Sequence, residues 1–344
     1  MTIIAMNKNF STTSFPWHTD QWRQIESYKD KLPHALLLTG TTGLGKSAFA
    51  NKLAQRTLCP DGLNHQSRSC SSCRLIESGT NPDLLIVDSS SASKQILIED
   101  IHEVRSFLQM TSHLGKGKVV VIHDADKMNS SAANALLKVL EEPPVGKYLI
   151  LSSSATSMIL PTILSRCVKI KFTPPSLPSI EQWFKQELSQ LNTKNPNKDG
   201  KDLKDANSGA LDKLLQDDLL LSINNSSPLS ILNMLQNGKA DLLHRLNDDL
   251  DDLTNFNSTK FPAYKDLDLI EIMDLLLWRT EKQILSKFNQ KQLDETKPLF
   301  ALRSLLLARR SMLMRKLNIN RELLLEECLL AIPHLSQIPQ IPRT

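Results

Sequence analysis

A glycine-rich segment near the start of the chain has the spacing Gly-x-x-x-x-Gly-Lys-Ser. It comprises Gly40, Thr41, Thr42, Gly43, Leu44, Gly45, Lys46 and Ser47. In a loop of this kind, backbone N–H groups turn onto phosphate oxygens, the lysine reaches the β- and γ-phosphates, and the serine hydroxyl binds Mg²⁺. The segment therefore predicts a site for ATP or ADP with Mg²⁺.

The elements on both sides of this loop agree with that prediction. The short apolar run 35–38 indicates a buried strand, and residues 47–58 have the pattern of a helix. A helix that begins at the loop adds the partial positive charge of its N-terminus to the anion site. The alternative is a chance glycine-rich turn, which the strand–loop–helix context disfavours.

A second group of residues has the chemistry of a metal site. Cys59, Cys70 and Cys73 lie close in sequence to His65, and residues 70–73 form a Cys-x-x-Cys pair. Thiolates and an imidazole suit tetrahedral Zn²⁺. Two alternatives stay open: a redox-active pair, although no thioredoxin-like pattern surrounds it, and plain thiols in a loop. We expect a zinc module at 59–73.

Further apolar runs alternate with helical patterns up to about residue 173. The strand-like runs are 84–87, 119–122, 148–151 and 168–172, and the longer helical patterns are 98–110 and 129–142. Such alternation predicts an α/β fold with a parallel sheet covered by helices on both faces. The run 119–122 leads to Asp124, and an acidic residue at this edge is where a phosphate-loop protein holds its second magnesium contact.

The character of the chain changes after residues 174–175. Later apolar patterns are helical, residues 192–208 are almost free of apolar side chains, and the chain is rich in leucine from about residue 241. No run of 18 apolar residues is present, so we expect no membrane span. Five cysteines without a signal-peptide pattern predict a reducing, cytoplasmic location, and a net charge of +4 does not identify a nucleic-acid binder.

Several segments together resemble the delta-prime subunits of bacterial DNA polymerase III clamp loaders, which belong to the AAA+ family. The resemblance covers nearly the whole chain. Its most specific segments are 34–37, 79–83, 133–144, 164–167 and 319–324. The resemblance implies an AAA+ base domain over 1–173, a small helical lid over 174–242 and an all-α collar for oligomerisation over 243–344.

The resemblance also implies partners. Clamp-loader subunits form a hetero-oligomeric ring that includes gamma/tau and delta subunits, and the ring places a sliding clamp on primer–template DNA. The chain is then a subunit of a DNA-directed DNA polymerase assembly without a polymerase site of its own. In this family the delta-prime subunit is a stator beside the ATP-hydrolysing motor subunits.

Departures from the motor pattern suggest that the chain binds nucleotide but hydrolyses it poorly. A motor carries Asp-Glu after the third strand, whereas this chain has Asp124 followed by Ala125. A methyl group cannot orient the attacking water. The lid arginine of motors is replaced by Leu229, while Ser153 matches the polar residue that senses the γ-phosphate.

Two more positions take their expected roles from the resemblance. Arg166 matches the arginine that clamp-loader subunits project into a neighbour's nucleotide site. The family's zinc site has four cysteines, and Ser67 stands where one of them is expected. A serine hydroxyl is a poor zinc ligand, so His65 becomes the candidate for the fourth bond.

Two other functions compete with this interpretation. An active gamma/tau-type motor would share the intact loop, but Ala125 and Leu229 argue against it. An unrelated nucleotide kinase would need an arginine-rich lid, and residues 174–241 contain no arginine.

Overall fold

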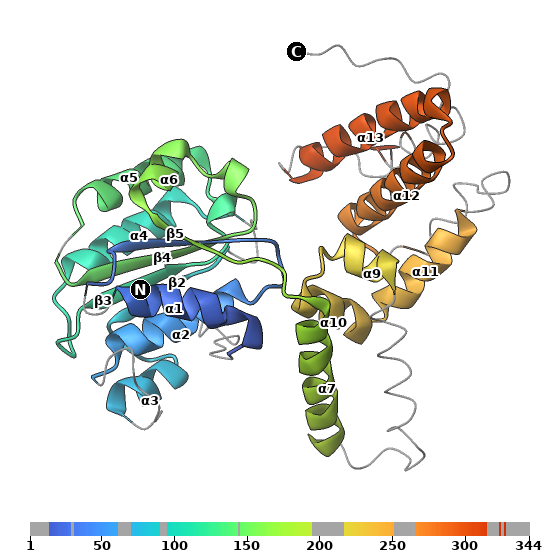
Figure 1. Ribbon diagram of the computed structural model, residues 1–344. Helices are drawn as coiled ribbons and strands as arrows, with labels where there is room; N and C mark the ends of the chain where they lie inside the picture. The colour runs from blue at the N-terminus through green and yellow to red at the C-terminus, as the bar shows by residue number, and fades with distance from the viewer. Residues whose placement is uncertain are drawn as a thin grey trace. The chain divides into compact units, whose positions relative to one another are not determined.

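The structure is a computed structural model, and it divides the chain into two compact units, residues 1–191 and 192–344 (Figure 1). It describes residues 14–28, 31–60, 70–89, 95–143, 145–194, 217–250, 264, 266–314, 323–324 and 327. The predicted division at 173 and 242 into base, lid and collar stays a prediction. His65, Ser67 and residues 319–322 lie outside the described residues.

The first unit is built on a parallel sheet of five strands, as the alternating pattern predicted. The strands are β1 (Ala35–Thr39), β2 (Leu84–Val87), β3 (Lys118–Ile122), β4 (Lys147–Ser153) and β5 (Val168–Lys171). Their order in the sheet is β2-β3-β4-β1-β5, and every neighbouring pair is parallel. Because β1 lies between β4 and β5, the loop after β1 meets the chain leaving β4 at the carboxyl edge, where ligands of parallel sheets bind.

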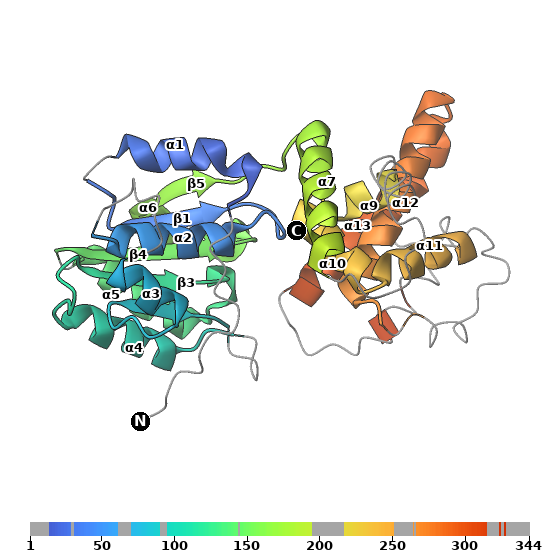
Figure 2. The ribbon, with the colours of Figure 1, turned by 90° about the horizontal axis from the view of Figure 1, so that it is seen from below.

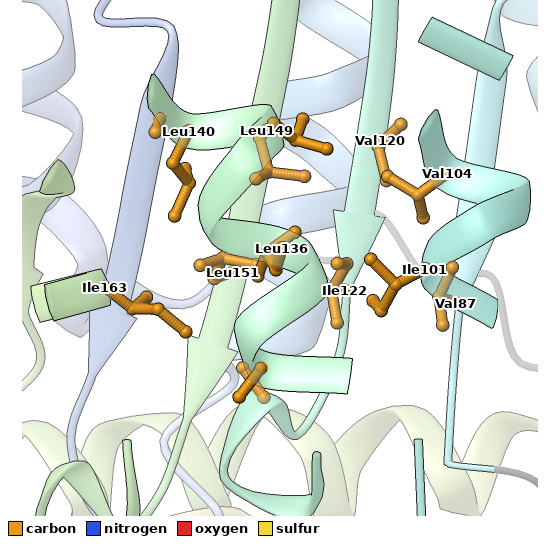
Figure 3. Packing of buried hydrophobic residues seen from close by; sticks show 14 of the residues in the cluster. Val87, Ile101, Val104, Val120, Ile122, Leu136, Leu140, Leu149, Leu151 and Ile163 are labelled. Atoms are coloured by element: carbon orange, nitrogen blue, oxygen red, sulfur yellow. The ribbon is translucent and has the colours of Figure 1, made fainter. Parts of the chain in front are cut away.

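Helices cover both faces of the sheet, so β1 and β3 are buried along their whole length (Figures 1 and 2). On one face lie α1 (Thr19–Ser27), α2 (Lys46–Leu58) and α3 (Ser71–Glu77), and on the other lie α4 (Ile98–Gln109), α5 (Ser130–Glu141) and α6 (Pro161–Arg166). Figure 3 shows Ile101 and Leu136, from α4 and α5, packed towards Ile122 and Leu151 of the sheet. The described residues of this unit also contain the short 3₁₀ turns η1 (Pro16–His18), η3 (Ala125–Lys127) and η4 (Thr156–Met158).

A buried ion pair joins the start of β2 to the start of β3. Asp83 Oδ1 lies 3.2 Å from Lys118 Nζ, and both side chains are 1% exposed. The Asp83 carboxylate also accepts the N–H groups of His113 (2.9 Å) and Leu114 (2.7 Å) and the Ser112 hydroxyl (2.8 Å). Burial alone would raise the pKa of Asp83, but these donors lower it. The carboxylate therefore stays charged and fixes the loop between α4 and β3.

The later part of the chain is helical, as predicted. Helix α7 (Leu177–Lys194) crosses the boundary between the units, and the second unit contains α9 (Asp218–Ile223), α10 (Pro228–Gln236), α11 (Lys239–Asp249), α12 (Leu269–Asn289) and α13 (Leu293–Met314). Leucine side chains from these helices form its core. None of the helices in the described ranges has the length and apolar content needed to cross a membrane.

Substitution of Asp83 by Asn should destabilise the first unit strongly. The change leaves the Lys118 ammonium buried without a counter-charge, which typically costs about 3–5 kcal/mol. The control is Asp20→Asn, which breaks an exposed pair with Arg23 (side chains 83% and 74% exposed) and should cost less than about 1 kcal/mol. Urea unfolding followed by circular dichroism measures both; equal midpoints for the two variants would contradict the prediction.

Candidate nucleotide and metal sites

The 40–47 loop has a backbone that requires glycine at two positions. Gly40 and Gly45 have φ values of 150° and 82°. A Cβ atom on Gly40 would lie 2.5 Å from the carbonyl oxygen of Phe172, and one on Gly45 would lie 2.6 Å from the ring of Phe15. The glycines at these positions thus allow the loop to pack closely against both neighbouring segments.

The segment before α1 braces this loop. Trp17 Nε1 donates a hydrogen bond to the Leu44 carbonyl at 3.0 Å, and His18 Nε2 lies 2.7 Å from the same oxygen. Burial lowers the pKa of His18 to about 4, so the imidazole is neutral at pH 7 and Nε2 carries the donated hydrogen. The Gly-x-x-x-x-Gly-Lys-Ser motif does not include these two residues, and no sequence signal links them to the loop.

Lys46 is bonded to the loop itself. Its Nζ donates to the carbonyl oxygens of Gly40 (2.7 Å) and Thr41 (2.6 Å), and it lies 3.2 Å from Ser154 Oγ. Burial lowers the pKa of Lys46 to about 8, an effect that the charges of Asp124 and Asp126 oppose. An incoming phosphate must therefore compete with two carbonyl groups for this ammonium.

The hydroxyl beside Lys46 belongs to Ser154 and not to Ser153. Ser153 is fully buried, and its Oγ accepts the N–H of Ala155 at 3.2 Å. Its role as γ-phosphate sensor stays a prediction. The sequence has three consecutive serines, 152–154, at the end of β4, so only the register of the strand end could identify the one that contacts the lysine.

The acidic residues at this edge already have partners. Asp124 Oδ2 lies 2.6 Å from Lys127 Nζ, and Asp126 Oδ1 accepts the N–H of Ser154 at 2.9 Å. Next to them, His123 is 6% exposed and its Nε2 lies 3.2 Å from Asn51 Oδ1 on α2. Mg²⁺ requires oxygen ligands in near-ideal octahedral geometry. These groups do not fit a magnesium ion between the loop and the end of β3, and the role of Asp124 as a magnesium contact stays a prediction.

Three cysteines meet beside α3. The Sγ atoms of Cys59, Cys70 and Cys73 all lie within 4.8 Å of one another, and those of Cys59 and Cys70 are 3.7 Å apart. Cys70 also caps α3, because its Sγ accepts the Cys73 N–H at 3.3 Å. A tetrahedron with Zn–S bonds of about 2.3 Å has S···S edges of about 3.8 Å. The cluster fits a metal ion bound by three thiolates.

Arg166 ends α6 on the surface of the first unit. Its Nη2 lies 2.8 Å from Glu141 Oε1, its Nη1 donates to the Thr162 carbonyl at 3.0 Å, and the side chain is 36% exposed. The guanidinium is thus oriented by α5 and α6 and stays accessible to solvent.

Ala125 and Leu229, the two positions that depart from the motor pattern, both lie within described elements. Ala125 begins η3 and is 2% exposed, so no carboxylate stands at this position of the edge. Leu229 lies in the first turn of α10, in the second unit.

Known proteins are similar to the first half of the chain. A family model described as "DNA polymerase III, delta subunit" matches residues 18–176. The DNA polymerase III subunit delta′ of Pseudomonas aeruginosa is 36% identical over 175 residues, which are 51% of this chain and 53% of that protein. The subunit delta′ of Bacillus subtilis is 38% identical over 163 residues (47% and 49%), and the subunit gamma of Buchnera aphidicola subsp. Schizaphis graminum is 34% identical over 161 residues (46% and 44%).

The chain spans about half the length of the curated relatives it matches. The matched part contains the 40–47 loop, the three-cysteine cluster and Arg166. Residues 18–176 therefore resemble the family of DNA polymerase III delta subunits and the subunits named delta′ of other bacteria.

Proposed function

We propose that the chain is a delta-prime subunit of a bacterial DNA polymerase III clamp loader and helps to load the sliding clamp onto primed DNA. The match of residues 18–176 to the family carries this proposal. The proposed partners are gamma/tau and delta subunits in a hetero-oligomeric ring, with the clamp and the primer–template DNA contacted through the complex.

The proposal includes nucleotide binding with poor hydrolysis. The loop glycines and Lys46 support binding, because they provide backbone N–H groups and a buried cation for phosphate oxygens. Hydrolysis needs a group that orients the attacking water. Ala125 cannot do so, and the carboxylate of Asp124 is paired with Lys127.

Arg166 is proposed to act on the nucleotide of a neighbouring subunit. A guanidinium is a planar, permanently charged fork that stabilises charge on the γ-phosphoryl oxygens. The exposure of Arg166 and its support by Glu141 and α6 suit a side chain presented to a partner. The subunit would then contribute to catalysis without hydrolysing ATP itself.

An active gamma/tau-type motor is the second candidate function. It is favoured by the intact loop and by the 34% identity to a subunit named gamma. The alanine at 125 and the leucine at 229 disfavour it, because two groups that act on the γ-phosphate are missing.

We further propose that Cys59, Cys70 and Cys73 hold one structural Zn²⁺, with His65 as the candidate fourth ligand. The spacing of the sulfur atoms supports three of these ligands. A closed site with four protein ligands leaves no position for a reactive water, so the ion would stabilise the link between α2 and α3.

Replacing Arg166 by Ala should leave ring assembly intact and slow the whole complex. In related phosphoryl-transfer systems an arginine finger raises the rate at its own site by about 10³ to 10⁵. The rate of the whole complex should fall by less, because other nucleotide sites in the ring keep their arginines. Arg166→Lys should restore little, because lysine lacks the fork. The measurements are co-purification of the ring, clamp- and DNA-stimulated ATPase and clamp loading, with Arg23→Ala as the control. Unchanged rates for Arg166→Ala would refute the finger, whereas failure to co-purify with clamp-loader subunits would refute the family role.

Isolated protein should bind ATP or ADP and turn ATP over at well below about 1 s⁻¹, the lower end of ordinary enzyme rates. Lys46→Ala should abolish binding, because it removes the buried ammonium at the loop. Calorimetry and a phosphate-release assay test both statements, with the exposed Lys116→Ala as the control. Turnover at ordinary enzyme rates would support the motor function instead.

Purified protein should contain one Zn²⁺ per chain. Cys73→Ser should lose the ion, because a hydroxyl is a poor zinc ligand, whereas Cys167→Ser, a buried thiol outside the cluster, should retain it. Elemental analysis under reducing conditions measures the zinc content of the unmodified protein and of both variants. Only a trace of zinc in the unmodified protein would reject the site; zinc retained in His65→Ala would reject only the histidine.

A further inference from the structure

The residue that follows β3 and faces the helix of the phosphate-binding loop is a histidine. The His123 N–H donates to the Val87 carbonyl at 2.9 Å, and its ring reaches Asn51 on α2. Asn51 lies one helical turn after Ser47, on the same face of α2. Imidazole suits zinc, copper, iron and nickel, whereas Mg²⁺ is bound by carboxylates, carbonyls and water. The side chain directed from β3 towards α2 is therefore a poor magnesium ligand.

The next residue, Asp124, turns its carboxylate to a cation of the chain. Asp124 has a φ of 51°, a left-handed backbone that non-glycine residues rarely adopt. The Lys127 N–H donates to the Asp124 carbonyl at 2.7 Å, and this tight turn brings Lys127 Nζ to 2.6 Å from Asp124 Oδ2. An ammonium group thus stands beside the carboxylate that would otherwise serve a divalent cation.

The other carboxylates near this edge also interact with groups of the protein. Asp126 accepts the backbone N–H of Ser154, which ties it to the loop after β4. Asp88 follows β2, and its negative charge acts on His123, where it opposes the lowering of the histidine's pKa by burial. Among the described residues, no hydrogen bond joins the Ser47 hydroxyl to a carboxylate, and Asp124 and Asp126 are bonded to other groups.

We infer that ATP or ADP binds to residues 40–47 without Mg²⁺, as the free nucleotide. This inference rests on the proposed nucleotide binding and names the form of nucleotide that the site takes. Two cations of the chain act in place of the metal: Lys46 faces the phosphate oxygens, and Lys127 neutralises Asp124, so that its carboxylate does not repel them.

The first test measures ADP binding to the full chain by calorimetry, once with excess MgCl₂ and once with EDTA. The dissociation constant should be no lower with Mg²⁺, and Mn²⁺ added with ADP should show no protein-bound signal in electron paramagnetic resonance. A dissociation constant lower by about tenfold or more with Mg²⁺, equivalent to one logarithmic unit of affinity, would overturn the inference and leave the nucleotide proposal intact. Absence of binding in both conditions would overturn both, while the ring-assembly experiment still decides the clamp-loader role.

A double variant tests the stated cause. His123→Asp directs a carboxylate towards α2 and Lys127→Met releases Asp124, so the double variant should bind ADP more tightly with Mg²⁺ than with EDTA. Lys116→Met is the control and should behave like the unmodified protein. If the double variant does not fold, Lys127→Met alone should bind free ADP more weakly, because Asp124 is no longer neutralised. Unchanged binding by Lys127→Met would overturn the role given to the lysine.

Discussion

The buried ammonium of Lys46, at the carboxyl edge of the sheet, is the charge around which the neighbouring loops of the first unit are arranged. Lys46 is 7% exposed, so the protein itself must provide the hydrogen bonds that water would otherwise supply. The carbonyls of Gly40 and Thr41 do so directly, and Asp124 and Asp126 stabilise the charge from a greater distance. The loop, the end of β3 and the end of β4 are thus arranged around one positive charge, which suits the capture of an anion.

Binding and hydrolysis make separate demands on this edge. Binding a phosphate needs backbone N–H groups and a cation, and both survive in the loop. Hydrolysis also needs a base or water-orienting group and usually a divalent metal. Two features of this edge bear on these additional groups: Ala125 has no carboxylate, and the carboxylate of Asp124 is paired with Lys127. The edge is therefore suited to a subunit whose nucleotide has a structural role.

The sequence predicted the sheet and the loop because their signals are local. Continuous apolar runs mark strands that are covered on both faces, and the glycine spacing marks the loop. The supports of the loop could not be predicted, because Trp17 and His18 reach Leu44 across more than twenty residues of chain. Which of the three consecutive serines 152–154 contacts Lys46 depends on the register of β4, and the structure shows that it is Ser154. The pairing of Asp124 with Lys127 depends on the left-handed backbone of Asp124, which could not be predicted from the residue type.

The pairing of Arg166 with Glu141 has a consequence for its proposed role in a neighbouring subunit. Both side chains are partly exposed, and an ion pair of this kind contributes at most about 1 kcal/mol. A bidentate contact between a guanidinium and a phosphate is stronger, because both partners are charged and the geometry of the fork matches. In that proposed role, Glu141 would orient the guanidinium before assembly and would release it at little cost to a partner's nucleotide. A deeply buried pair such as Asp83–Lys118 could not do this, because separating its charges would leave each without a counter-charge in the protein interior.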